Sequence, residues 1–127
     1  MNFNWAEFNE LAQELIGHPG LNSSLDAVCR TAISRAYYAV FCTALERLVY
    51  VDNVYIDTTR DAHQQVRDAF RTSGAAERRR VAVHLNTLRV LRNVADYEAM
   101  PSQPVDSYAA QDCTDLAAIV LDTVRNL

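Results

Sequence analysis

The chain has 127 residues, half of them apolar, and a formal net charge of −4 at pH 7. This length is typical of one domain and is sufficient for one continuous hydrophobic core. Glycine and proline number only three each, and β-branched residues do not cluster, so the composition argues against a strand-rich structure. We therefore expect a single all-α domain over residues 1–127.

Targeting and metal-binding patterns are missing from the sequence. The first residues lack the basic and apolar regions of a secretory signal, and the most apolar stretch, 36–45, is about half of what a bilayer requires. We expect a soluble cytoplasmic protein without membrane contact. Cys29, Cys42 and Cys113 form no CxxC pair and no ligand spacing with a histidine, which indicates buried thiols and neither a metal nor another cofactor.

Basic residues are unevenly distributed along the chain. All twelve are arginines, and eight of them lie between positions 60 and 92 beside only three acidic residues. This segment carries about +5, whereas the remainder carries about −9. An acidic protein of this kind is not a general nucleic-acid binder. Its arginine-rich segment can still hold one phosphate-bearing ligand, because guanidinium groups match phosphate oxygens.

Apolar periodicity predicts about five helices joined by short connections. The first covers about 4–16, with Gly17 and Pro19 as its stop, and the second opens at a cap formed by Ser23 and Ser24. The expected ranges of the later helices are about 25–50, 58–73, 75–97 and 105–126, and 51–57 is expected to be a loop. Because the second helix is apolar around much of its girth, from Leu25 to Leu48, we expect an up-and-down antiparallel bundle around it.

The fourth helix holds the main candidates for a site. Arg89, Arg92 and Asp96 share one face, and Arg92 can pair with Asp96 at i,i+4. His84 stands eight residues before Arg92, roughly 12 Å along the axis, and is expected on nearly the same side. The competing interpretation is a solvated charged stripe, which most bundle helices carry.

The central helix places one charge among apolar residues. Arg35 is followed by Tyr37 and Tyr38, and burying an unpaired guanidinium is costly. We therefore expect Arg35 to be paired or to lie at an interface. The arginines of 78–80 point three ways around their helix, so they are expected in a solvated turn.

Three segments resemble prokaryotic HEPN-domain proteins. Residues 32–41, AISRAYYAVF, look like the family's second-helix signature, and 61–63 with Val66 and Phe70 resemble its third helix. Residues 88–97, LRVLRNVADY, are similar to its Leu-x-x-x-Arg-x-x-Ala-Asp-Tyr helix. Order and spacing agree over nearly the whole chain. The resemblance implies a HEPN-like helical bundle, usually dimeric, and often a partner nucleotidyltransferase in a toxin–antitoxin or defence module.

The resemblance also implies a chemistry that this chain matches only in part. Ribonuclease members carry Arg, usually a polar residue next, and His four to six positions after the Arg, and two such motifs meet across a dimer in a metal-independent site. Arg92 and Asn93 match the first half of this motif. Tyr97 stands where the His is expected, and no His follows Arg92. A phenol with a pKa of about 10 is a poor general base near neutral pH.

Three hypotheses follow. In the first, the chain is a homodimeric partner protein that binds RNA, a nucleotide or a nucleotidyltransferase without robust nuclease activity; the candidate binding residues are Arg89, Arg92, Asp96, Tyr97, Arg35, His63 and His84. In the second, it is an endoribonuclease with a non-standard site; the candidate catalytic residues are Arg92, Asn93 and Tyr97. There, His63 or His84 would serve only if dimer packing brought it to Arg92. In the third, Arg92, Asp96 and Tyr97 merely hold the fourth helix to its neighbours in a protein-interaction module.

Overall fold

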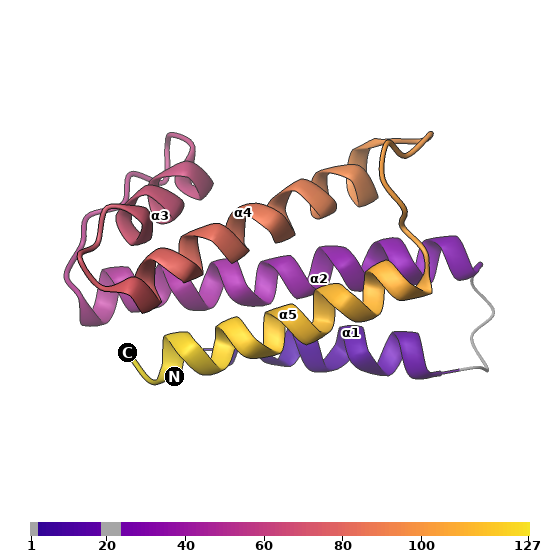
Figure 1. The fold of residues 1–127 in the computed structure, drawn as a ribbon, viewed down its shortest axis with the longest axis horizontal. Coiled ribbons are helices and arrows are strands. Elements are labelled where there is room, and N and C mark those ends of the chain that lie inside the picture. The colour runs from indigo at the N-terminus through magenta and orange to yellow at the C-terminus, as the bar shows by residue number, and fades with distance from the viewer. Residues whose placement is uncertain (1–2, 19–23) are drawn as a thin grey trace.

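The computed structural model describes residues 3–18 and 24–127, and within these ranges it contains helices and no strand. The elements are α1 (Glu7–Gly17), α2 (Leu25–Glu46), the π-helical turn η1 (Arg47–Val51), α3 (Ala62–Arg71), α4 (Ala76–Tyr97) and α5 (Ser107–Arg125). The long helices α1, α2, α4 and α5 alternate in direction, and the short α3 lies against α4 (Figure 1). The predicted bundle of five α-helices is therefore confirmed.

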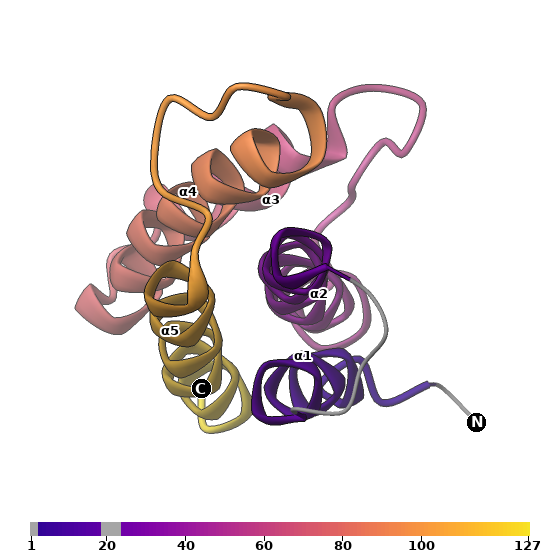
Figure 2. The same cartoon turned by 90° about the vertical axis from the view of Figure 1, so that its right-hand side faces the viewer.

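Helix α2 is the centre of the bundle. It packs against the other four α-helices, and seen along the axes α1, α2, α4 and α5 surround a common interior (Figure 2). Eleven of its residues are buried, as expected for a helix that is apolar around much of its girth. Ser24 caps the helix by accepting a hydrogen bond from the backbone of Ala27. Leu25 was expected to face inward, but it is exposed because it belongs to the first turn, beyond the packed faces.

Two helix boundaries differ from expectation, and one expected stop cannot be compared. Helix α3 begins at Ala62 rather than near 58, because Asp61 caps it by accepting from the backbone of Gln64. Helix α2 does not continue regularly to 50, since its last turn widens into η1. The expected loop after it contains no strand in the described chain. The predicted stop at Pro19 lies outside the described residues.

Arg78 is not part of a solvated turn. Its guanidinium donates to both carboxylate oxygens of Asp52, at 2.7 and 3.2 Å, and lies over the ring of Phe70. Asp52 also accepts from Nε of Arg47 at 3.3 Å. The two arginines hold the pKa of Asp52 below its usual value, the hydrogen bond from Arg78 being the largest cause. This ion-pair network fastens the connection after η1 to the start of α4.

The end of α4 is fixed from α2. Nη1 of Arg30 donates to the carbonyl oxygens of Ala95 and Glu98 at 3.0 and 2.8 Å, and lies 3.4 Å from that of Val94. The carbonyl of Val94 also accepts from the backbone of Glu98, whereas those of Ala95 and Glu98 have no described backbone donor. A cation at this helix end also interacts favourably with the helix dipole. Arg30 in turn pairs with Asp26 one turn earlier. The last turn of α4, which carries the resemblance to the HEPN family, is thereby held in place.

Helices in the described part of the chain are not both long and apolar enough to cross a membrane.

Candidate functional site

Arg92 is buried among aromatic rings. Its side chain is only 7% exposed, and its guanidinium carbon lies 5.0, 5.4 and 5.8 Å from the ring centroids of Tyr37, Tyr38 and Tyr97. No described residue gives it a carboxylate partner or a hydrogen bond, and its Nε is buried without a partner. Burial of a charge costs several kcal/mol, whereas each cation–π contact returns about 0.5–2 kcal/mol. Arg92 therefore favours an anion beside it.

Asp96 does not neutralise Arg92, contrary to the expected i,i+4 pair. Its carboxylate accepts a hydrogen bond from the buried Ser34 hydroxyl of α2 at 3.1 Å. Arg92 instead turns toward the tyrosine rings of α2. Asp96 thus ties α4 to α2 and leaves the charge of Arg92 uncompensated.

His63 reaches the same tyrosine from α3. Its Nδ1 and the hydroxyl of Tyr37 are hydrogen-bonded at 2.5 Å, and its ring stacks on Phe41 with centroids 4.1 Å apart. Tyr37 consequently contacts both His63 and Arg92 within one protomer. His63 therefore lies near Arg92 through the shared Tyr37, without a described direct contact between the two. The expectation that dimer packing would have to bring a histidine to Arg92 stays a prediction.

The protonation states of this pair follow from their surroundings. Burial raises the pKa of Tyr37 to about 12, against the opposing effect of the Arg92 charge. Burial lowers the pKa of His63 below 6.5, and the positive charge of Arg92 lowers it further. Near pH 7 the phenol is therefore protonated and the imidazole neutral. Because Tyr37 engages Nδ1, Nε2 is the ring nitrogen of His63 that remains for a ligand.

Arg35 is the second arginine beside Tyr38. Its guanidinium carbon is 5.1 Å from the centroid of Tyr38 and 5.0 Å from that of Phe8 in α1. The sequence led us to expect an ion pair or an interface, but within the described chain aromatic rings take the place of a carboxylate. Tyr38 is thus contacted by two guanidinium groups, those of Arg35 and Arg92.

Two further arginines add positive charge to this region. Nε of Arg89 and Nη1 of Arg67 are buried without a described partner, and both charges lower the pKa of Tyr37 and of His63. Arg89 was predicted as a binding residue, but Arg67 was not. The available signal was its position four residues after His63, which places both on one face of α3.

Tyr97 and Asn93 are weaker candidates for catalysis. Tyr97 is 74% exposed, and among the described contacts it meets the site at Arg92 alone. Asn93 is half-buried, and its side chain makes no hydrogen bond with the described residues. Neither side chain is held in an orientation that proton transfer requires.

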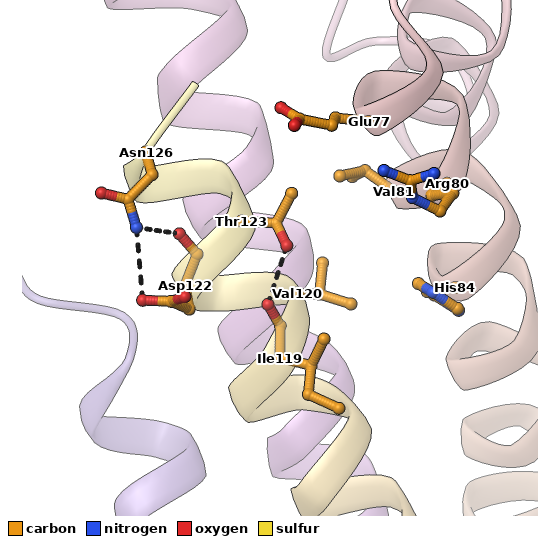
Figure 3. Close-up of a pocket in the computed structure, with 9 residues that line it drawn as sticks. All are labelled: Glu77, Arg80, Val81, His84, Ile119, Val120, Asp122, Thr123 and Asn126. Carbon is orange, nitrogen blue, oxygen red and sulfur yellow. Dashed lines mark hydrogen bonds between the residues drawn. The ribbon is translucent and has the colours of Figure 1, made fainter.

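His84 is not part of the site. It lines a cavity of about 360 Å³ between α4 and α5, where it lies near Arg80 and faces Val120 and Ile119 (Figure 3). Eight residues correspond to two helical turns plus about 80°, so His84 and Arg92 project toward different neighbours. The expectation that they share a side was wrong, because that rotation is enough to exchange α2 for α5.

Cysteines and metal-ligating residues do not gather in the described part of the chain. Cys29 and Cys113 are buried as predicted, and burial raises the pKa of Cys113 to about 12 and that of the half-buried Cys42 to about 11. Among the described residues no group of three or more His, Cys, Asp or Glu side chains is arranged to hold a metal ion. The chemistry that Arg92, Arg89 and His63 together offer is therefore anion binding beside a neutral imidazole.

Comparison with protein-family models, with curated proteins and with solved structures gives no match for this chain. Its function must therefore be inferred from its own residues and from the geometry around Arg92.

Proposed function

We propose that this chain is a HEPN-like domain that binds a phosphate group of RNA or of a nucleotide at the Arg92 cluster, which consists of Arg92, Arg89, Tyr37, Tyr38 and His63. One observation carries the proposal: Arg92 is buried, and no described residue neutralises it. A phosphate supplies both the negative charge and the acceptor oxygens that a guanidinium fork matches.

The other members of the cluster support the same ligand. Arg89 adds a second unpartnered donor, and the arginine-rich segment concentrates positive charge on an otherwise acidic protein. The described hydrogen bond of the His63 ring uses Nδ1, so Nε2 is left for a ligand, and Tyr38 presents a half-buried ring. These groups favour one local phosphate over general attraction to nucleic acid.

The proposal extends to partners. By resemblance, the chain forms a homodimer in the cytoplasm and acts with a nucleotidyltransferase in a toxin–antitoxin or defence pair. The molar mass from light scattering after size-exclusion chromatography tests the dimer, and the mass of a monomer at micromolar concentration would contradict it. The gene beside this one tests the pairing, because an unrelated neighbour would argue against it.

Calorimetric titration tests phosphate binding directly. A nucleoside 5′-monophosphate is titrated into the wild-type protein and into Arg92→Met, which keeps side-chain volume but removes the charge. Loss of a charged hydrogen bond should weaken binding at least about tenfold. Arg80→Gln is the matched control, since it removes a charge from the same helix on the side that faces α5. Equal binding by wild type and Arg92→Met would refute the proposal, as would a wild type that binds neither the monophosphate nor an RNA oligonucleotide.

A metal-independent endoribonuclease is the second candidate, and the position of His63 favours it. His63 and Arg92 both contact Tyr37 in one protomer. A candidate base, His63, and a candidate phosphate-binding residue, Arg92, therefore lie close to each other. In this scheme the ribose 2′-oxygen attacks the adjacent phosphorus while His63 takes its proton, and the bond to the 5′-oxygen breaks. The leaving 5′-oxygen takes up a proton from water, so the products are a 2′,3′-cyclic phosphate and a 5′-hydroxyl.

Incubation with RNA in the presence of EDTA separates the two functions. Cleavage by the wild type that disappears in both His63→Asn and Arg92→Met would establish the nuclease. An intact RNA pool, or cleavage that persists in His63→Asn, would eliminate this mechanism.

A further inference from the structure

A groove between α3 and α4 adjoins the Arg92 cluster. It encloses about 570 Å³, and three arginines line it: Arg67 and Arg71 from α3, and Arg79 from α4. Asp68 is the only acidic residue of its described lining, and it is paired with Arg71 at 2.9 Å. This α3–α4 groove therefore carries net positive charge.

The groove is continuous with the Arg92 cluster through two residues. Arg67 lines the groove, and its charge also acts on Tyr37 and His63. On the opposite wall Asn86 lines the groove and accepts a hydrogen bond from Nη2 of Arg89 at 3.1 Å. The cavity and the cluster thus belong to one basic track between the two helices.

A single phosphate cannot occupy this track. Arg79 and Arg92 are separated by thirteen residues of one helix, which corresponds to about 20 Å along the axis. Donors without a described partner are distributed over Arg67, Arg89 and Arg92 rather than gathered at one point. Such a distribution suits a chain of phosphates.

Two features indicate which kind of phosphate-bearing polymer the groove suits. The axes of packed helices typically lie about 8–10 Å apart, so the groove between α3 and α4 is narrow and suits one strand better than a duplex. Apolar surface is exposed along the track, since Val83 in the groove is 62% exposed and Tyr97 beside Arg92 is 74% exposed. An exposed tyrosine ring provides a stacking surface for a base, which an inorganic polyphosphate would leave unused.

We propose that the ligand of the Arg92 cluster is single-stranded RNA whose backbone continues along the α3–α4 groove, with Arg67, Arg71 and Arg79 contacting phosphates beyond the one at Arg92. The inference rests on the proposed function and specifies its substrate class. The expected ligand is an oligonucleotide of several nucleotides rather than a mononucleotide.

Binding of a uridine octamer and of uridine 5′-monophosphate, each measured over a range of salt concentrations, tests the groove. The octamer should bind at least tenfold more tightly. Each phosphate contact contributes a slope of about −0.7 to log K against log salt, so the four contacts at Arg92, Arg67, Arg71 and Arg79 give about −2.8. The double variant Arg71→Gln/Arg79→Gln should reduce the octamer slope by about 1.4 and leave the affinity for the monophosphate unchanged.

The matched control is Arg60→Gln/Arg80→Gln, which removes the same charge outside the groove. The side chain of Arg60 is 83% exposed, and Arg80 lines the cavity facing α5. This control should bind the octamer within twofold of wild type at moderate salt. Circular dichroism melting confirms that both double variants are folded.

The outcomes distinguish the groove from the cluster. If the monophosphate binds in an Arg92-dependent way but the octamer binds no tighter, the groove is refuted and the Arg92 cluster stands. If neither ligand binds to the wild type, the proposed function itself fails. If inorganic polyphosphate binds as tightly as the octamer, the groove accepts phosphate chains without reading bases, and RNA as the substrate class is refuted.

Discussion

Arg92 and His63 contact the same side chain from two different helices: the guanidinium carbon of Arg92 lies 5.0 Å from the ring centroid of Tyr37, and Nδ1 of His63 is hydrogen-bonded to its hydroxyl. Tyr37 therefore sits between a permanent cation and a titratable base. The pKa of the phenol is about 12, so it remains protonated over the range in which His63 titrates. A substitution of Arg92 should therefore change the pKa of His63, and the packing of both residues should contribute to the stability of the fold around Tyr37.

Arg92→Met should leave the folded protein as stable as the wild type or raise its free energy of unfolding by up to about 1 kcal/mol. The substitution removes a buried charge that no described residue neutralises, and this gain offsets the lost cation–π contacts. Arg92→Ala should instead lower it by about 1–3 kcal/mol, because the packing of the stem is lost as well. Urea denaturation at pH 7 measures both. A loss above about 2 kcal/mol in Arg92→Met would favour the hypothesis that Arg92 is a structural staple.

The pKa of His63 should be below 6.5 in the wild type and should rise in Arg92→Met. Removal of a nearby positive charge favours the protonated imidazole, whereas burial, the larger cause of the lowered pKa, remains. Nuclear magnetic resonance of the imidazole protons during a pH titration gives both values. Arg80→Gln should leave the pKa of His63 unchanged, and an equal rise in both variants would show a general charge effect instead.

Stability should decrease as the pH falls through the range in which His63 titrates. The folded-state pKa is lowered, so the unfolded chain binds a proton first, and the contribution of His63 is complete above about 6.5 and is lost toward the folded pKa. Urea denaturation at pH 7.5 and 5.5 measures the change for wild type and for His63→Asn. The variant should show the smaller decrease, and parallel curves would contradict the assignment.

The sequence alone predicted the helices, and it supplied several residues of the proposed Arg92 cluster as candidates, because both depend on local patterns. Apolar spacing within α2 located the central helix, and the arginines of α4 were recognised from their own neighbours. The meeting of Tyr37 with His63 was not predictable in this way, since it depends on how α3 is rotated against α2. His84 is a different case: its distance of eight residues from Arg92 already implied a rotation of about 80° along α4, but which helix that rotation makes it face depends on where α5 packs.

Arg78→Met should lower the free energy of unfolding by about 1–3 kcal/mol at pH 7, because it deprives Asp52 of a bidentate partner. The folded-state pKa of Asp52 is lowered, so its contribution is present above about pH 4 and is lost as the pH falls through the folded value. The cost of the substitution, measured by urea denaturation, should therefore shrink at pH 2.5. Asp52→Asn combined with Arg78→Met completes a double-mutant cycle, and additive effects would show that the pair contributes nothing.

Arg30→Met should destabilise the last turn of α4 although Arg30 belongs to α2. Its Nη1 donates hydrogen bonds to three carbonyl oxygens at that helix end. Loss of these hydrogen bonds should lower the free energy of unfolding by about 1–2 kcal/mol. Hydrogen exchange should accelerate at the amides of residues 94–97, while amides in the middle of α4 keep their protection. Ligand binding should weaken as well, since this turn carries Tyr97 and follows Arg92. Asp26→Asn provides the control: it removes only an exposed ion pair and should cost at most about 0.5 kcal/mol. If Asp26→Asn matched Arg30→Met, the ion pair and not the carbonyl cap would hold the end of α4.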